Sequence, residues 1–176
     1  MYCGNNKTAL ASQQQISGAL LSLMRDKPFS SISVSELCKQ SGVSRQTFYS
    51  LFRSKENVVL FTLREKYCYL PAHKGGAANL SHLCAGYSSY ICDNRDYLKL
   101  LVDNDIVYLL YESIYSSFMD CCCGLPASPA ERSYAAHFLA GGLTGIVKNY
   151  CIDNCCLDQT GLERILNDLF SGSLFA

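Results

Sequence analysis

Apolar side chains recur three and four residues apart along almost the whole chain, whereas the two-residue alternation of a half-buried strand is essentially absent. This periodicity predicts an all-α protein. The four prolines stand where helices are expected to begin or end. We expect helices near residues 7–25, 34–41, 45–51, 55–69, 80–92, 95–102, 105–121, 129–153 and 161–171. The apolar stripe of the first should comprise Leu10, Ile16, Leu20, Leu23 and Met24.

Serines and one glycine mark the ends of the short helices. Ser33 and Glu36 fit a capping box, in which the serine oxygen accepts from the N3 amide and the glutamate reaches back to the Ser33 N–H. Gly42 should end that helix, because glycine enters the left-handed region at little cost. Ser44 should cap the following helix. Further caps are expected at Ser54, at Ser128 with Glu131, and at Thr160 with Glu163.

The net charge of zero conceals an uneven distribution. Residues 1–66 hold nine Lys and Arg against four Asp and Glu, whereas residues 67–176 hold six against eleven. This +5 and −5 division indicates an N-terminal part that binds a polyanion. No apolar run approaches the roughly 20 residues of a membrane helix, and the N-terminus lacks the apolar segment of a secretory signal. We therefore expect a cytoplasmic protein with no membrane partner.

Residues 33–52 match the helix-turn-helix pattern: a capped short helix, a glycine turn and a second short helix. On the second helix, Phe48 and Phe52 lie one turn apart and should face the interior. Arg45, Gln46 and Tyr49 fall on the other side. Arginine can pair with guanine, glutamine with adenine, and a tyrosine hydroxyl with phosphate. Since the same geometry also occurs as simple packing, the spacing alone leaves both interpretations open.

The stretch FSSISVSELCKQSGVSRQTFYSLFRSKENVV, residues 29–59, closely resembles the DNA-binding domain of the TetR family of bacterial transcription regulators. The resemblance implies base-reading positions at Arg45 and Gln46 and phosphate contacts by several neighbours. Leu51 stands where the family commonly has His or Tyr, so one phosphate contact should be missing. We expect a DNA-binding domain at residues 1–54 and a helical regulatory and dimerisation domain at 55–176. The expected DNA-binding residues are Ser33, Ser44, Arg45, Gln46, Thr47, Tyr49 and Lys55.

Several glycines fall within one long predicted helix, in the stretch HFLAGGLTGIVKNY at residues 137–150. Each costs about 1 kcal/mol relative to alanine, which close approach of another helix would offset. The pattern resembles a short TetR subgroup that includes the activator of dihydroxyacetone kinase operons, in which the last two helices form a four-helix dimer interface. Packing within the chain is the alternative. The expected interface residues are Gly141, Gly142, Gly145, Leu162, Ile165 and Leu166.

The middle of the chain is rich in aromatic residues. Tyrosine combines an apolar body with a polar tip, which suits a ligand pocket, but the helical spacing suits a plain core equally well. The resemblance implies an effector cavity among these helices. We expect the signal to come from a small molecule, or otherwise from a protein partner. The pocket candidates are Tyr87, Tyr90, Tyr108, Tyr111, Tyr115, Tyr134 and Phe138.

The eleven cysteines raise the question of thiol or metal sensing, with Cys151 and Cys155 one helical turn apart if their helix extends that far. There is no C-x-x-C motif, and free cysteine usually acts as a small apolar residue, so we expect no cofactor or metal. Motifs for catalysis are missing too, and an enzyme is not expected. The chain should be a repressor that binds a palindromic operator as a homodimer and responds to an effector. An activator or co-regulator controlled by a protein partner and a thiol or metal sensor are the alternatives.

Overall fold

The computed structural model describes residues 6–67, 80–120 and 128–173. Within these ranges every regular element is a helix, which confirms the all-α class. None of the helices described there is both long and apolar enough to cross a membrane. Residues 70–79, between two of the expected helices, and the cysteines at 121–123 lie outside the described residues. The elements are α1 (Lys7–Asp26), the 3₁₀ turn η1 (Phe29–Ser31), α2 (Val34–Ser41), α3 (Arg45–Leu51), α4 (Lys55–Tyr67), α5 (Leu80–Asp93), α6 (Arg95–Asp103), α7 (Tyr108–Asp120), α8 (Pro129–Ile152) and α9 (Gln159–Ser171).

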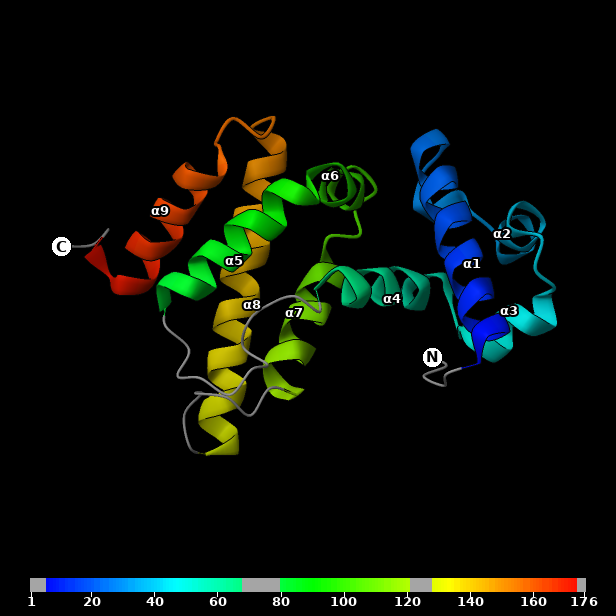
Figure 1. Cartoon of the computed structure of the whole chain (residues 1–176), viewed down its shortest axis with the longest axis horizontal. Helices are drawn as coiled ribbons and strands as arrows, with labels where there is room; N and C mark the ends of the chain where they lie inside the picture. The colour runs from blue at the N-terminus through cyan, green and yellow to red at the C-terminus, as the bar shows by residue number, and fades with distance from the viewer. Residues whose placement is uncertain (1–5, 68–79, 121–127, 174–176) are drawn as a thin grey trace.

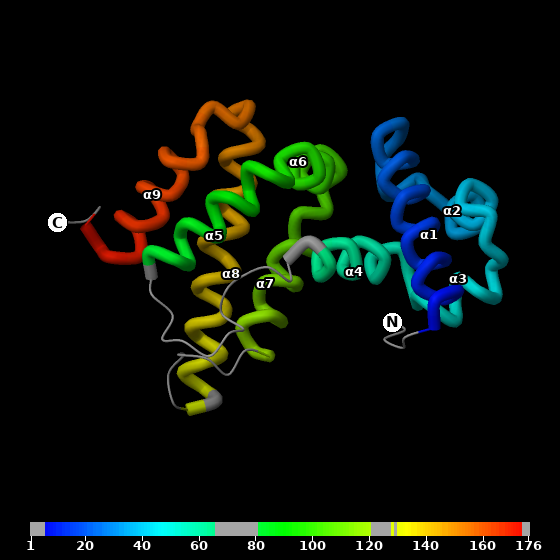
Figure 2. The backbone as a smooth tube through the Cα atoms, viewed as in Figure 1, coloured from blue at the N-terminus to red at the C-terminus, as the bar shows by residue number. Residues whose placement is uncertain are grey.

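Helix α4 joins two groups of helices. Figure 1 shows α1, α2 and α3 gathered at one end, with α5 to α9 at the other. The tube in Figure 2 shows the same division, with α4 running between the groups. Helix α4 packs against both α1 and α7, so it belongs to the core of each group. A movement of α4 would therefore change the packing of both groups.

The small group has a core centred on the recognition-helix phenylalanines. Phe48 and Phe52 are both fully buried, as their four-residue spacing predicts. The Phe52 ring lies 5.6 Å from the ring of Phe61, which fixes the end of α3 to α4. Of the predicted α1 stripe, all but one residue is buried. The exception is Leu10, which is 40% exposed, so the buried stripe does not extend to this residue.

In the larger group, α8 and α9 pack against different neighbours. Helix α8 packs against α6 and α7, and Ala140, Leu143 and Val147 are buried there. Helix α9 packs against α5, and Leu162 and Leu166 are buried. Burial of each such leucine or valine contributes about 1.5–3 kcal/mol. The two C-terminal helices are therefore held in place by the rest of the chain.

Two helix starts differ from the sequence prediction. Helix α9 begins at Gln159 rather than 161, because the Asp158 side chain caps it by accepting from the Gly161 N–H at 2.8 Å. Helix α7 begins at Tyr108 rather than 105, since Asp105 has a positive φ of 58° that ends the preceding helix. The predicted capping box of Ser128 and Glu131 is present at the start of α8.

Candidate nucleic-acid interface

Helices α2 and α3 form the predicted helix-turn-helix. Gly42 follows α2 with a φ of 68°, the left-handed conformation that lets the chain reverse with little strain. The Val43 N–H then donates to the Cys38 carbonyl at 3.1 Å, which closes the end of α2. A side chain at position 42 would be strained by the backbone conformation rather than by a neighbouring atom.

Serine side chains cap both helices at their first turns. The Ser33 oxygen accepts from the Glu36 N–H at 3.2 Å, and the Ser44 oxygen accepts from the Thr47 N–H at 3.0 Å. The Glu36 carboxylate contacts the Lys27 ammonium. The hydrogen bond from Lys27 lowers the pKa of Glu36. The serine half of the predicted capping box is therefore present, and the Glu36 carboxylate binds a cation from the end of α1.

Helix α3 has one buried and one exposed face. Phe48 and Leu51 are buried against α2 and the rest of the small core. On the opposite face, Arg45 and Gln46 are exposed and Tyr49 is 50% exposed. The three exposed residues are those whose side chains can read bases and bind phosphate.

A neighbouring helix orients Arg45, which the sequence analysis did not foresee. Arg45 Nη1 donates to Ser35 Oγ at 2.9 Å, from α3 to α2. The guanidinium keeps its other N–H groups for a ligand. Ser35 is one position after the start of α2, so the helix-turn-helix geometry itself brings the two side chains together. Only the placement of both helices could have revealed this contact.

The structure gives Lys55 a role within the protein. Its ammonium donates to the carbonyl oxygens of Phe29, at 2.8 Å, and Ile32, and it lies 4.5 Å from the centre of the Phe29 ring. Burial lowers the pKa of Lys55. With two carbonyls and a ring already bound, the ammonium supports the α1–α2 connection.

Leu51 also has a place that the sequence alone did not show. Its side chain is 4% exposed and belongs to the core of the small group. Leucine thus stands where the family commonly has His or Tyr, and its apolar contacts hold α3 against its neighbours.

The structure places the seven effector-pocket candidates in different surroundings. Tyr87 and Tyr90 are buried core residues, and burial raises the pKa of both hydroxyls. Tyr108 and Tyr134 are exposed, at 51% and 79%. Tyr111 and Tyr115 instead stack with a residue of α8: the rings of Tyr115 and His137 lie 4.4 Å apart. The aromatic middle therefore divides between core, surface and one α7–α8 stack.

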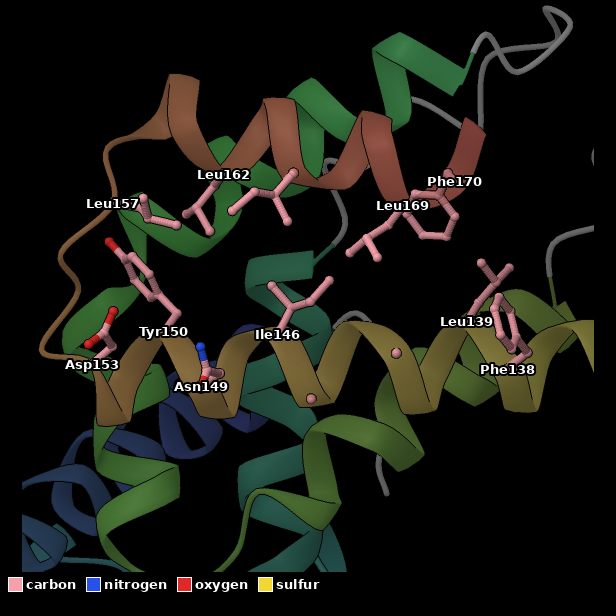
Figure 3. Close-up of a pocket in the computed structure, with 13 residues that line it drawn as sticks. Phe138, Leu139, Ile146, Asn149, Tyr150, Asp153, Leu157, Leu162, Leu169 and Phe170 are labelled. Atoms are coloured by element: carbon pink, nitrogen blue, oxygen red, sulfur yellow. The ribbon is translucent and has the colours of Figure 1, made fainter. Parts of the chain in front are cut away.

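An apolar groove lies between α8 and α9, with a volume of about 450 Å³. Figure 3 shows Ile146 and Leu139 of α8 and Leu162 and Leu169 of α9 pointing into the space between the two helices. Phe138, a pocket candidate, lines this groove and is 73% exposed. Apolar surface of this kind is common where proteins bind other chains or apolar ligands.

The glycines of α8 are open toward this groove. Gly142 and Gly145 line it, and a Cβ atom added at either one meets no neighbouring heavy atom within 4 Å. Packing within the chain therefore does not require these glycines. Ile165 and Leu162 also line the groove, whereas Leu166 is fully buried in the core. Gly141 is exposed and has open space around its Cβ position.

Three of the six described cysteines are buried thiols: Cys38, Cys84 and Cys151. Burial raises the pKa of Cys151 to about 11 and also raises those of Cys38 and Cys84. Such thiols stay protonated at neutral pH, whereas metal binding and nucleophilic attack need the thiolate. Helix α8 ends at Ile152 and Cys155 has a φ of 58°, so Cys151 and Cys155 do not share a helical face. No metal-binding group of three or more His, Cys, Asp or Glu side chains occurs among the described residues.

Comparison with known proteins agrees with this geometry. The family described as "Bacterial regulatory proteins, tetR family" matches residues 16–60, which cover α2, α3 and parts of α1 and α4. Over 41 residues the chain is 51% identical to the HTH-type transcriptional regulator EthR of Mycobacterium tuberculosis. That segment is 23% of this chain and 19% of EthR, so the likeness spans about a fifth of either protein.

Two solved structures share the fold over nearly the whole chain. Lin0861 from Listeria innocua is 14% identical with a TM-score of 0.75, covering 97% of this chain and 95% of that one. The dihydroxyacetone kinase operon activator DhaS is 17% identical with a TM-score of 0.52, covering 93% and 94%. The helix-turn-helix, its exposed face and these likenesses agree: residues 16–60 form a helix-turn-helix domain of the tetR family, and the chain shares its overall fold with the two solved structures.

Proposed function

We propose that the protein binds a palindromic DNA operator as a homodimer and represses the adjacent gene until an effector acts on its larger half. The observation that carries this proposal is the division of α3. Phe48 and Leu51 anchor one face, and Arg45, Gln46 and Tyr49 stand exposed on the other. Thr47, Ser44 and Ser33 at the helix starts complete the proposed DNA contacts, and Lys55 is left out because its ammonium is already bound.

The α8–α9 groove supports the homodimer. One recognition helix offers few base contacts, and two-fold symmetric dimers provide a second one for the other half of a palindrome. The groove is apolar, and the open glycines would let a helix of a second copy approach closely. Phe138, at 73% exposure, would become buried. The proposed interface comprises Phe138, Gly142, Gly145, Leu162 and Ile165.

A signal in the larger half can reach DNA through α4. This helix packs against α1 on one side and α7 on the other. An effector that binds one arrangement of α5 to α8 more tightly would shift the population of DNA-binding dimers. The effector is proposed to be a small molecule, with a protein partner as the second possibility.

Repression needs only that the bound dimer occupy the promoter, in the cytoplasm where the DNA lies. Activation would need a further surface that contacts the transcription machinery. The name of DhaS describes that relative as an activator, so activation is the second candidate for this chain.

The test is a gel shift of the purified protein on the DNA that flanks its own gene. Wild type should shift a near-palindrome whose half-sites lie about 34–36 Å apart. Transcription from that promoter in vitro should then fall as protein is added. A rise in transcript would replace repression by activation, and failure to shift any flanking or selected duplex would overturn the DNA-binding proposal.

A further inference from the structure

One side chain of the larger group of helices, α5 to α9, binds the main chain of the smaller group, α1 to α3, at two points. We call the smaller group the helix-turn-helix unit. Asn104 directly follows α6 as its C-cap. Its Oδ1 accepts from the Phe29 N–H at 2.7 Å, and its Nδ2 donates to the Met24 carbonyl at 3.2 Å. These partners lie 75 and 80 residues away in the sequence. The same Nδ2 also donates to the Leu100 carbonyl at 2.9 Å within α6.

The chemistry of these three contacts requires an amide. Phe29 offers an N–H and needs an acceptor, whereas Met24 and Leu100 offer carbonyls and need donors. An asparagine side chain has one acceptor oxygen and two N–H donors, so one orientation serves all three partners. An aspartate would lack the donors, and a leucine would lack every polar group.

The Phe29 peptide is held from its other side by Lys55. The Phe29 carbonyl accepts from Lys55 Nζ at 2.8 Å, and the Phe29 ring lies beneath the same ammonium. Lys55 is the first residue of α4 and follows shortly after the recognition helix. Asn104, Phe29 and Lys55 thus connect the end of α6, the α1–α2 link and the start of α4.

The contact at Asn104 matters because α1 and α6 are not among the described helix pairs that pack extensively. A hollow of about 200 Å³ separates Leu21 and Arg25 of α1 from Asp96 and Leu100 of α6. Figure 1 shows α6 on the side of the larger group that faces α1. Apart from α4 itself, the polar contact at the C-terminal end of α6 is therefore a fixed point between the two groups.

We propose that Asn104 is a positioning residue that sets the orientation of the helix-turn-helix unit on the larger half. In a dimer it would thereby set the separation of the two recognition helices. This inference rests on the proposed function. To that function it adds a role for Asn104, which makes the dimer selective for one spacing between the half-sites.

The experiment compares wild type with Asn104→Leu, which removes all three bonds, and Asn104→Asp, which keeps only the acceptor. Asn167→Leu is the matched control, because Asn167 Nδ2 donates to the Glu163 carbonyl at 2.9 Å in the same i−4 manner within α9, away from the helix-turn-helix. Duplexes carry the selected operator with the original spacing or with one base pair added or removed between the half-sites.

Wild type and Asn167→Leu should discriminate strongly between the spacings. Asn104→Leu should lower the ratio of affinities for the best and the shifted spacing by about tenfold, because it loses both neutral hydrogen bonds between the two groups of helices, and Asn104→Asp by less, because it loses one of them. Each isolated half-site should be bound as by wild type. A folded Asn104→Leu dimer with the wild-type ratio would overturn the proposal, and if that variant does not fold, Asn104→Asp decides by the same ratio.

A second experiment tests the role of Asn104 without DNA. Hydrogen exchange of the Phe29 amide, followed by NMR, should accelerate roughly three- to tenfold in both Asn104 variants, because each weakens the holding of this unit. Residual dipolar couplings should show a broader distribution of orientations between the α1–α3 unit and α5–α9. Wild-type exchange and couplings in the variants would refute the role of Asn104, whereas absence of DNA binding by wild type with altered exchange in the variants would refute the proposed function alone.

Discussion

The carboxylate of Glu36, in the first turn of α2, contacts the ammonium of Lys27, which precedes the 3₁₀ turn. The contact ties the start of the helix-turn-helix to the end of α1. Because the hydrogen bond from Lys27 lowers the pKa of Glu36 below its ordinary value of 4.5, the folded protein holds the ionised form preferentially.

This contact predicts an acid-dependent loss of stability. A carboxyl group with a lowered folded-state pKa contributes stability above its unfolded value, and the contribution is lost as pH falls through the folded value. Glu36→Gln should therefore have a lower melting temperature than wild type near neutral pH, and the difference should disappear toward pH 3. Thermal unfolding across this range measures it. The control Glu112→Gln removes an exposed carboxylate of α7, and an equal pH-dependent loss there would contradict the assignment.

The bound ammonium of Lys55 predicts a loss of stability rather than a loss of DNA contact. Lys55→Met keeps the apolar stem but leaves the carbonyls of Phe29 and Ile32 without this donor, which should cost about 1–3 kcal/mol of unfolding free energy. The slope of operator affinity against salt concentration should stay as in wild type. Chemical denaturation and salt titration measure the two quantities.

Arg53→Met is the matched control for that experiment, since Arg53 is an exposed cation two residues earlier. Its stability should lie within about 0.5 kcal/mol of wild type. If Lys55→Met instead keeps full stability and lowers the salt slope by about one, then Lys55 binds phosphate as the family resemblance implies.

The helix-turn-helix could be read from the sequence because its determinants are local. Ser44 caps an amide three residues later, Gly42 needs only its own φ, and Phe48 and Phe52 are four residues apart. Each of these patterns involves neighbours within one or two turns. The exposed positions of Arg45 and Tyr49 followed from the same periodicity.

The remaining features depend on partners that are distant in the sequence. Asn104 carries no local signal, because its partner at Phe29 is 75 residues away. Periodicity places Leu10 on the apolar face of α1 but cannot tell how far the covering helices extend. The sequence predicts a cap at Thr160 for α9, but the structure uses Asp158, which follows a backbone turn with positive φ at Asn154 and Cys155.

The exposed position of Arg45 on α3 predicts that this residue determines specificity at one base pair of each half-site. Arg45→Ala should weaken binding to the best operator by about 1–3 kcal/mol and relax the preference at a single position in each half-site. Ser35→Ala should have a smaller effect of the same kind, because Ser35 orients the guanidinium through a 2.9 Å hydrogen bond. Tyr49→Phe should weaken binding about equally for all sequences, as loss of a phosphate contact does.

Competition titrations at fixed salt, with duplexes substituted at each position, distinguish these outcomes. Ser50→Ala is the control on the same helix, since the Ser50 hydroxyl donates to the Thr47 carbonyl. The assignment of the reading face is wrong if Arg45→Ala and Tyr49→Phe bind as wild type does.

The open glycines of α8 predict opposite effects on the helix and on the dimer. Because an added Cβ meets no neighbouring atom within 4 Å, Gly142→Ala and Gly145→Ala should stabilise α8 in the single chain by up to about 1 kcal/mol each. Gly142→Leu and Gly145→Leu should fill the space that a second copy needs, so the dimer should dissociate at concentrations where wild type is dimeric. Sedimentation equilibrium gives the association constant.

Gly18→Ala is the matched control, because Gly18 is an exposed glycine within α1 and also has open space at its Cβ position. It should gain helix stability and leave association unchanged. Helical circular dichroism should stay at the wild-type level in the leucine variants, which separates loss of the interface from loss of the fold. Leucine variants that remain dimeric with wild-type affinity would place the dimer contact elsewhere than the α8–α9 groove. The groove would then be free for an apolar effector, since its volume of about 450 Å³ lies within the range of small-molecule sites.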